Sequence, residues 1–269
     1  MTRARSLHIL CIVSAAITMA AAVAALAADS LTARQVTEQL HQAGEADRLD
    51  FSGRNLSGLD LAGLRFKKAM LVKSDLFGAD LSGADLSEAD LSDARLDRII
   101  AIGARFDRAN LSGASLLRPT TSMSVEAKLD EAPSFTEANL TKARMFGGFM
   151  GASFAGARMA GVTLAPENDT GFIDMFWRSR LDAADMTAAD LSGANLGHVS
   201  LRFANLRGAN LSGASLKSAD LSHADLTDAD LTGADLSNAD LDSARLSGVK
   251  GLESATGMAT VRNREKAIN

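Results

Sequence analysis

Residues 219–236 read ADLSHADLTDADLTGADL and belong to a longer run, from Arg180 to Gly248, that keeps one pattern. A large apolar residue stands at every fifth position, fourteen times in succession. Ala usually stands two positions before it, and Asp, Asn or Ser stands directly before it in twelve of the fourteen cases. The central apolar residues are Leu181, Met186, Leu191, Leu196, Leu201, Leu206, Leu211, Leu216, Leu221, Leu226, Leu231, Leu236, Leu241 and Leu246.

A period of five fits neither a long helix nor a long strand. Helices need apolar residues near every 3.6 positions and half-buried strands need them at every second position. The period fits a chain that turns a corner once per quintet and points the central residue inward each time. Such units cannot bury their apolar face alone, so they stack as a solenoid. One Leu and one Ala per side leave no room for a ligand inside.

The pattern Ala-Asp/Asn-Leu-Ser/Thr-X resembles the pentapeptide-repeat family, and it covers most of the chain from Phe51 to Gly248. The resemblance implies an all-β fold, a right-handed quadrilateral parallel β-helix. It also implies about four quintets per coil, so that residues about twenty apart stack at about the usual strand spacing of 4.8 Å. Some members of that family bind DNA gyrase as mimics of DNA.

The repeat is interrupted twice within residues 51–248. The phase breaks at about 117–134 and again at about 165–175. Proline cannot donate a hydrogen bond to a ladder of strands, so its position marks loops that leave the coil. Every proline of the chain stands in or beside these breaks: Pro119, Pro133 and Pro166.

The first 27 residues are typical of a secretory signal peptide. Arg3 and Arg5 precede an uncharged apolar run, and Ala25-Leu26-Ala27 offers a cleavage site near Ala27/Ala28. We therefore expect a periplasmic or secreted protein with no membrane attachment after cleavage. The alternative is an uncleaved anchor, because residues 6–28 are long enough to span a bilayer.

Cleavage would leave a thiol-free and acidic chain. The single cysteine, Cys11, lies within the signal, so disulfides and cysteine catalysis are excluded after cleavage. Without Arg3 and Arg5, 26 basic residues remain of 28, against 33 acidic ones, a net charge of −7. A nucleic-acid backbone requires a basic surface, so we expect no nucleic-acid partner.

Both ends of the repeat array need a cap. In the N-terminal segment 28–50, Thr32 and Gln35 form a capping box for a short helix over residues 32–43, which we expect to cover the first coil. Residues 249–269 lose the repeat and are mixed in charge, which predicts a C-terminal cap or tail.

Bulky apolar residues gather around the second interruption and form the first candidate site. An aromatic and Met cluster in a polar-faced solenoid is typical of an exposed patch that binds a protein partner. The alternative is that these side chains fold back and cover a defect in the coil. The candidate partner patch consists of Phe146, Phe149, Met150, Phe172, Ile173, Met175 and Trp177.

The second candidate site is an acidic belt, formed by the carboxylates before five successive leucines. A negatively charged rod is what a DNA mimic requires, although gyrase is cytoplasmic and a signal peptide would separate the two proteins. The alternative is a well-hydrated repeat consensus with no ligand. The acidic belt consists of Asp220, Asp225, Asp230, Asp235 and Asp240.

The sequence predicts no enzyme, cofactor or metal site. The stretch from Asp228 to Gly233 begins like a calcium loop, but Ala239 stands where the loop needs Glu. A polysaccharide-active β-helix enzyme would need paired carboxylates in a cleft, whereas the carboxylates here are spread evenly. We therefore expect an exported, non-enzymatic scaffold with a protein partner, with the DNA-mimic rod as the alternative and the polysaccharide enzyme as the weaker one.

Overall fold

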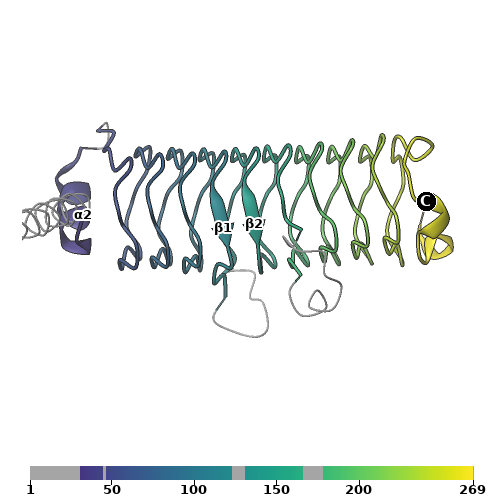
Figure 1. The fold of residues 1–269 in the computed structure, drawn as a ribbon, viewed down its shortest axis with the longest axis horizontal. Helices are drawn as coiled ribbons and strands as arrows, with labels where there is room; N and C mark the ends of the chain where they lie inside the picture. Colours follow the sequence, from purple (N-terminus) through teal and green to yellow (C-terminus); the bar gives the residue numbers. More distant parts are fainter. Residues whose placement is uncertain (1–30, 45–46, 123–130, 166–177, 269) are drawn as a thin grey trace, which may run out of the picture.

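The computed structural model describes residues 31–44, 47–122, 131–165 and 178–268. Figure 1 shows a row of stacked coils that form a rod, with helix α2 (Ala33–Gln42) at one end and the C-terminal residues at the other. Regular strands are short. They are β1 (Ser115–Leu117) and β2 (Arg144–Phe146), and the C-terminal end adds the 3-10 helices η1 (Met258–Thr260) and η2 (Arg264–Lys266).

The coils stack in a parallel register of twenty residues. Asp50 bridges Met70, and in the same coil Asn55, Asp60 and Arg65 bridge the residues twenty positions later. Each coil therefore holds four quintets, as the family resemblance implies. The bridging residues form four columns along the rod, which we name first, second, third and fourth after Asp50, Asn55, Asp60 and Arg65.

The regular quintets turn by the same hydrogen bonds. Around Leu221, the Leu N–H donates to the carbonyl of Asp240 in the next coil (2.9 Å), and Ala224 N–H donates back to the Leu221 carbonyl (3.0 Å). The residue two positions after the central one has positive φ, for example 60° at His223, which is the geometry of a type II turn. The turn points Leu221 and Ala224 inward, where both are fully buried.

The described ends of the two interruptions show where residues are inserted. Thr120 bridges Ile100 and Ser134 bridges Arg105, so one quintet is stretched to 14 residues. Thr163 bridges Asn195 and Arg180 bridges Gly148, so a second quintet is stretched to 17 residues. The first insertion follows the third column and the second precedes it.

Between the insertions the coil is one residue short. Ser134 bridges Ser153, 19 positions later, because Gly148 follows Arg144 by four positions instead of five. This shortening makes Phe149 a central inward residue, 1% exposed. Phe149 meets the rings of Phe135 and Phe154 edge to face, with centroids 6.4 and 6.2 Å away. The prediction that Phe149 belongs to an exposed patch is therefore wrong.

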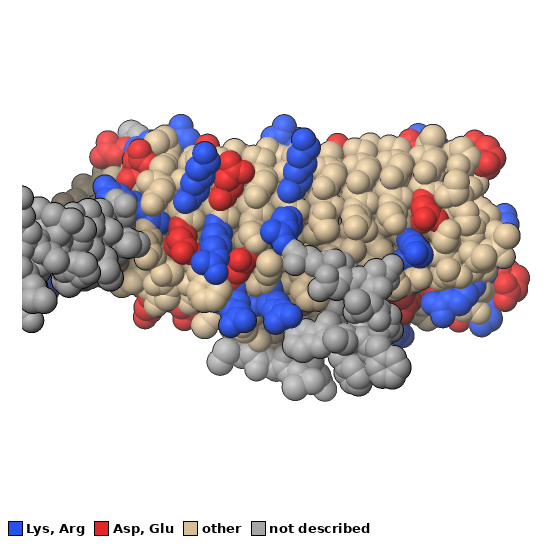
Figure 2. All heavy atoms as spheres, in the orientation of Figure 1, with Lys and Arg blue, Asp and Glu red and all other residues tan. Residues whose placement is uncertain are grey.

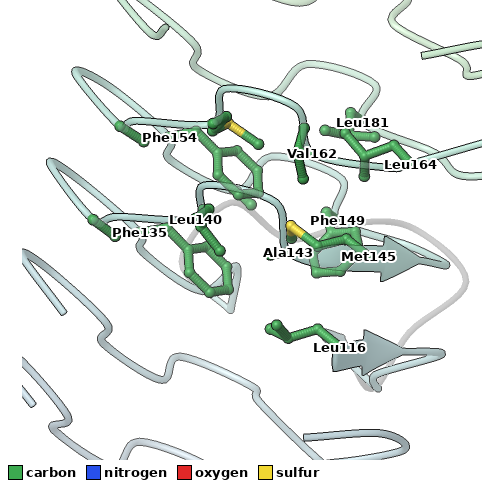
Figure 3. Close-up of a cluster of buried hydrophobic side chains, with 14 of the residues drawn as sticks. Leu116, Phe135, Leu140, Ala143, Met145, Phe149, Phe154, Val162, Leu164 and Leu181 are labelled. Carbon is green, nitrogen blue, oxygen red and sulfur yellow. The ribbon is translucent and has the colours of Figure 1, made fainter. Parts of the chain in front are cut away.

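Three phenylalanines from successive coils stack next to it. The Phe135 ring lies parallel to Phe106 and to Phe154, with centroids 4.9 and 5.0 Å away. Figure 3 shows Phe135 and Phe154 in line within the core, among Leu140, Met145 and Leu164. The interior of this region is filled by side chains.

The two ends of the rod are closed differently. Thr32 caps α2 through the predicted capping box, with Gln35 N–H donating to Thr32 Oγ1 (3.3 Å), and Val36 is fully buried against the core. At the other end the C-terminal residues remain paired with the preceding coil. Thr256, Arg262 and Ile268 bridge Asp235, Asp240 and Arg245, so residues 250–268 form one more coil. Within the described residues, no helix is long and apolar enough to cross a membrane.

Candidate interaction surface

The surface at the two insertions is built around β1 and β2. These strands pair in parallel, with Leu117 opposite Phe146, and both side chains are half-buried. Arg118 and Arg144 are exposed beside them, and Met150 is half-buried one turn further along the chain. We name this surface the interruption face; it consists of Leu117, Arg118, Arg144, Phe146 and Met150.

The ends of both insertions are fastened to the backbone of one segment, Gly147–Gly148. On the first insertion, Thr121 Oγ1 donates to the Gly148 carbonyl oxygen (3.0 Å). On the second, the fully buried Ser179 hydroxyl accepts from Gly147 N–H (3.3 Å) and donates to the Leu164 carbonyl oxygen (2.6 Å). Because this buried hydroxyl both accepts and donates a hydrogen bond, it holds the backbone segments of Gly147 and Leu164 in place. The interruption face therefore has a defined backbone.

Gly147 makes the shortened quintet possible. Its φ is +133°, and a Cβ added there would meet Arg118 Cα at 3.1 Å and Pro119 Cδ at 3.3 Å. A side chain at this position would strain the backbone and push β2 away from the segment after β1.

A strip of arginine and aromatic side chains continues from the interruption face toward earlier coils. Phe77 occupies the position of Leu117 two coils earlier, with the Arg95 guanidinium 4.3 Å and the Arg98 guanidinium 5.7 Å from its ring centroid. In the coil between Phe77 and Leu117, Asp97 occupies the same position, and its Oδ1 accepts a hydrogen bond from Leu117 N–H (3.0 Å). Figure 2 shows one face of the rod, where Lys and Arg gather over the earlier coils and a broad uncharged area lies over later ones.

The predicted partner patch is only partly represented in the described residues. Phe146 and Met150 lie on the interruption face, whereas Phe149 belongs to the core. The other four members lie outside the described residues: Phe172, Ile173, Met175 and Trp177. Leu117 and Arg118 were not predicted as site residues, because their place beside Phe146 depends on the first insertion.

The acidic belt surrounds the rod. Asp220 and Asp240 lie in the third column, while Asp225, Asp230 and Asp235 lie in the fourth, first and second columns. All five are half-buried. The five carboxylates therefore form no single acidic face.

These carboxylates also have structural partners. In each case Oδ1 accepts from the backbone N–H two residues on, at 2.9 to 3.1 Å. Burial raises the pKa of Asp225, but hydrogen bonds from the Thr227 hydroxyl and N–H and from Arg207 outweigh it, so that pKa lies below its usual value. Arg207 lies 3.3 Å from Asp225, and Arg262 lies 3.4 Å from Asp240. The belt carboxylates thus hold their turns in place, and arginines partly neutralise Asp225 and Asp240.

Metal ligands do not gather anywhere in the part of the chain that the structure describes, since no three His, Cys, Asp or Glu side chains converge there.

A comparison with protein-family models identifies the repeat. The model described as pentapeptide repeats matches residues 47–83, 79–116, 184–222 and 209–248, in eight copies, which together make up half of the chain. The chain belongs to the pentapeptide repeat family. The matched residues are the regular coils on either side of the insertions, so the interruption face lies in the part of the chain where this member departs from the family pattern.

Solved pentapeptide repeat proteins are among the similar structures. HetL from the cyanobacterium Nostoc sp. strain PCC 7120, a protein involved in heterocyst differentiation regulation, is 28% identical, with 83% of this chain and 90% of HetL covered and a TM-score of 0.35. Rfr23 from the cyanobacterium Cyanothece 51142 is 26% identical, with 56% and 89% covered and a TM-score of 0.35. QnrB1, a plasmid-mediated fluoroquinolone resistance protein, is 17% identical, with 81% and 90% covered and a TM-score of 0.33. A search of curated proteins found no match.

Proposed function

We propose that this pentapeptide repeat protein is an exported, non-enzymatic scaffold that binds a protein partner in the periplasm or at the cell exterior. The signal-like residues 1–27 support export, and the filled interior of the coils supports a role for the outer surface. A right-handed, four-sided course of the coils, which the family resemblance implies, is part of this proposal. The interruption face is the partner-binding surface.

The composition of the interruption face carries this proposal. Half-buried Leu117, Phe146 and Met150 lie next to exposed Arg118 and Arg144. Protein interfaces are enriched in aromatic residues, Met and Arg, and their strongest contacts are made by buried aromatic and Arg anchors. On the regular coils after the second interruption, the position of Phe146 holds Gly197, Lys217 and Ser237, which offer no apolar anchor, whereas Phe77 holds it on an earlier coil.

Site-specific photo-crosslinking in the native host tests the proposal. A benzophenone amino acid is placed at Met150 and, as a matched control, at Lys217, which occupies the position of Phe146 in a later coil. We expect one discrete protein adduct from position 150 and none from position 217. Phe146→Ser in the position-150 variant should remove that adduct while the circular dichroism spectrum stays unchanged.

Two outcomes would count against the proposal. Equal adducts from both positions would show that the interruption face has no special role. A discrete adduct that survives Phe146→Ser would place the contact elsewhere on the rod.

A further inference from the structure

Two aromatic rings stack on the outside of the rod, at a corner that follows the third column. The Phe203 and His223 rings belong to successive coils, lie 3° from parallel and have centroids 4.8 Å apart. The Arg202 guanidinium lies 5.8 Å from the centroid of the Phe203 ring. We name Phe203, His223 and Arg202 the outer stack.

Phe203 occupies a position that disfavours a bulky residue. Its φ is +58°, which is costly for a large side chain and free of strain for glycine. Other coils place small residues at this corner, namely Gly63, Gly83, Gly151, Ala183 and Ser243. The turn itself therefore does not require a phenylalanine, since glycine adopts this backbone conformation without strain.

Phe203 is also exposed. Its side chain is 56% exposed. Among the described residues, the one other exposed large hydrophobic residue is Ile268, at 52%. Exposed and strained large apolar residues are a cost to folding, so their presence points to a contact with another molecule.

Among the residues that the structure describes, no further ring continues the stack on the other side of Phe203. Ala183 N–H donates to the Arg202 carbonyl oxygen (2.8 Å), and Phe203 N–H donates to the Ser222 carbonyl oxygen (3.1 Å). Ala183 therefore occupies the same corner as Phe203, one coil earlier. Ala183 offers only a methyl group where Phe203 and His223 each offer a ring. A further planar ring in this place would stack on Phe203 and lie near the Arg202 guanidinium, and both contacts favour an aromatic group.

The shape of this corner indicates whether such a ring would belong to a small ligand or to a larger molecule. Ala183, Arg202, Phe203 and His223 are all exposed, so the outer stack stands on a convex edge of the rod. Small ligands need a concave site that buries most of their surface. A ring on a convex edge is buried only when it belongs to a larger surface that also covers its neighbours.

We propose that the outer stack is a second contact site, which takes an aromatic side chain of a protein partner over Ala183 and against Phe203. The inference rests on the proposed protein-binding function and adds to it the chemistry of one contact. The partner residue is Phe, Tyr or Trp, because an aliphatic side chain would lack the planar face that continues the stack.

Selection of peptides from a displayed random library on the full chain tests this inference. We expect selected peptides to be enriched in an aromatic residue and to bind Phe203→Gly at least tenfold more weakly. Ala188→Gly is the matched control, since Ala188 is an exposed residue with φ +55° on a different corner, and it should leave binding unchanged. Phe203→Gly should still fold as the parent does, because the strain that glycine relieves at this turn offsets the lost stack on His223.

Replacing the aromatic residue of a selected peptide with alanine should weaken binding to the parent chain and have little further effect on binding to Phe203→Gly. Peptides without aromatic enrichment, or with equal affinity for Phe203→Gly, would overturn the inference. If such peptides are instead lost on Phe146→Ser, the proposed function stands and the outer stack is not a contact site. If no peptide is selected at all, both the inference and the proposed function fail.

Discussion

Phe149→Ala removes a ring that is 1% exposed and that contacts Phe135 and Phe154 edge to face. Removing a buried phenylalanine side chain typically costs about 3–5 kcal/mol of unfolding free energy. Two aromatic contacts of about 0.5–1.5 kcal/mol each are part of that cost. Backbone bonds hold the surrounding coils in register, for example Phe149 N–H to the Arg180 carbonyl oxygen at 2.8 Å, so the coils cannot close over the cavity. We therefore expect a loss of about 4 kcal/mol.

Guanidinium chloride unfolding followed by circular dichroism measures this loss. With a denaturant slope of about 4 kcal/mol per molar, the midpoint should fall by about 1 M. Two other phenylalanines provide controls in the same experiment. Phe146→Ala, at a half-buried position, should cost about 1 kcal/mol, and Phe203→Gly should change the stability by less than about 1 kcal/mol in either direction. A cost below about 1 kcal/mol for Phe149→Ala, or a cost equal to that of Phe146→Ala, would refute the buried position of Phe149.

Other predictions follow from the turns and the ends of the rod. Gly147→Ala should cost about 1–3 kcal/mol, more than Gly213→Ala, because a Cβ at Gly147 meets backbone at 3.1 Å whereas Gly213 has open space around it; equal midpoints in denaturant would contradict this. Hydrogen bonds from Thr232 and Ser237 lower the pKa values of Asp230 and Asp235. This stabilisation is complete above the pKa of Asp in the unfolded chain, about 3.9, and is lost as the pH falls through the lower pKa values of the folded protein. The melting temperature should therefore drop between about pH 4 and pH 2. A melting temperature that stays constant over this range would count against the role of these carboxylates. Thr32→Ala removes the cap of α2 and should cost about 1 kcal/mol, measured as earlier loss of the helix signal on heating, whereas Thr37→Ala at a mid-helix position should cost less.

The architecture of the regular coils could be predicted from the sequence because one residue in five decides it. The spacing of Leu181 to Leu246 implies one turn per quintet, and the bridge of Asp50 to Met70 has the expected separation of twenty residues. The capping box of Thr32 and Gln35 is also a local pattern, and it forms as predicted. Both features are determined by residues close together in the sequence, so they could be predicted without knowledge of contacts between distant parts of the chain.

The inward position of Phe149 could not be predicted, because a single missing residue changes the role of every side chain near it. With the period held at five, Phe149 falls one place before the inward position after Met145. The spacing of nine positions between Met145 and Phe154 signals a missing residue but not where it is missing. Gly147, with φ +133°, absorbs it. The last coil was missed for the opposite reason. Extra residues between Lys250, Thr256, Arg262 and Ile268 hide the period, although these residues still bridge the preceding coil.

The outer stack was also missed by sequence reasoning, since Phe203 and His223 each occupy an ordinary outward position of the repeat. Their relation depends on the separation of twenty residues, which places one above the other. A search of outward positions for large residues twenty apart would have found the pair.

Cell fractionation of the native host, combined with the intact mass of the purified protein, tests the exported-scaffold account most directly. The account predicts a periplasmic or secreted protein whose mass corresponds to a chain that begins near Ala28. A full-length protein in the cytosol would contradict export and would bring the DNA-mimic alternative back into consideration.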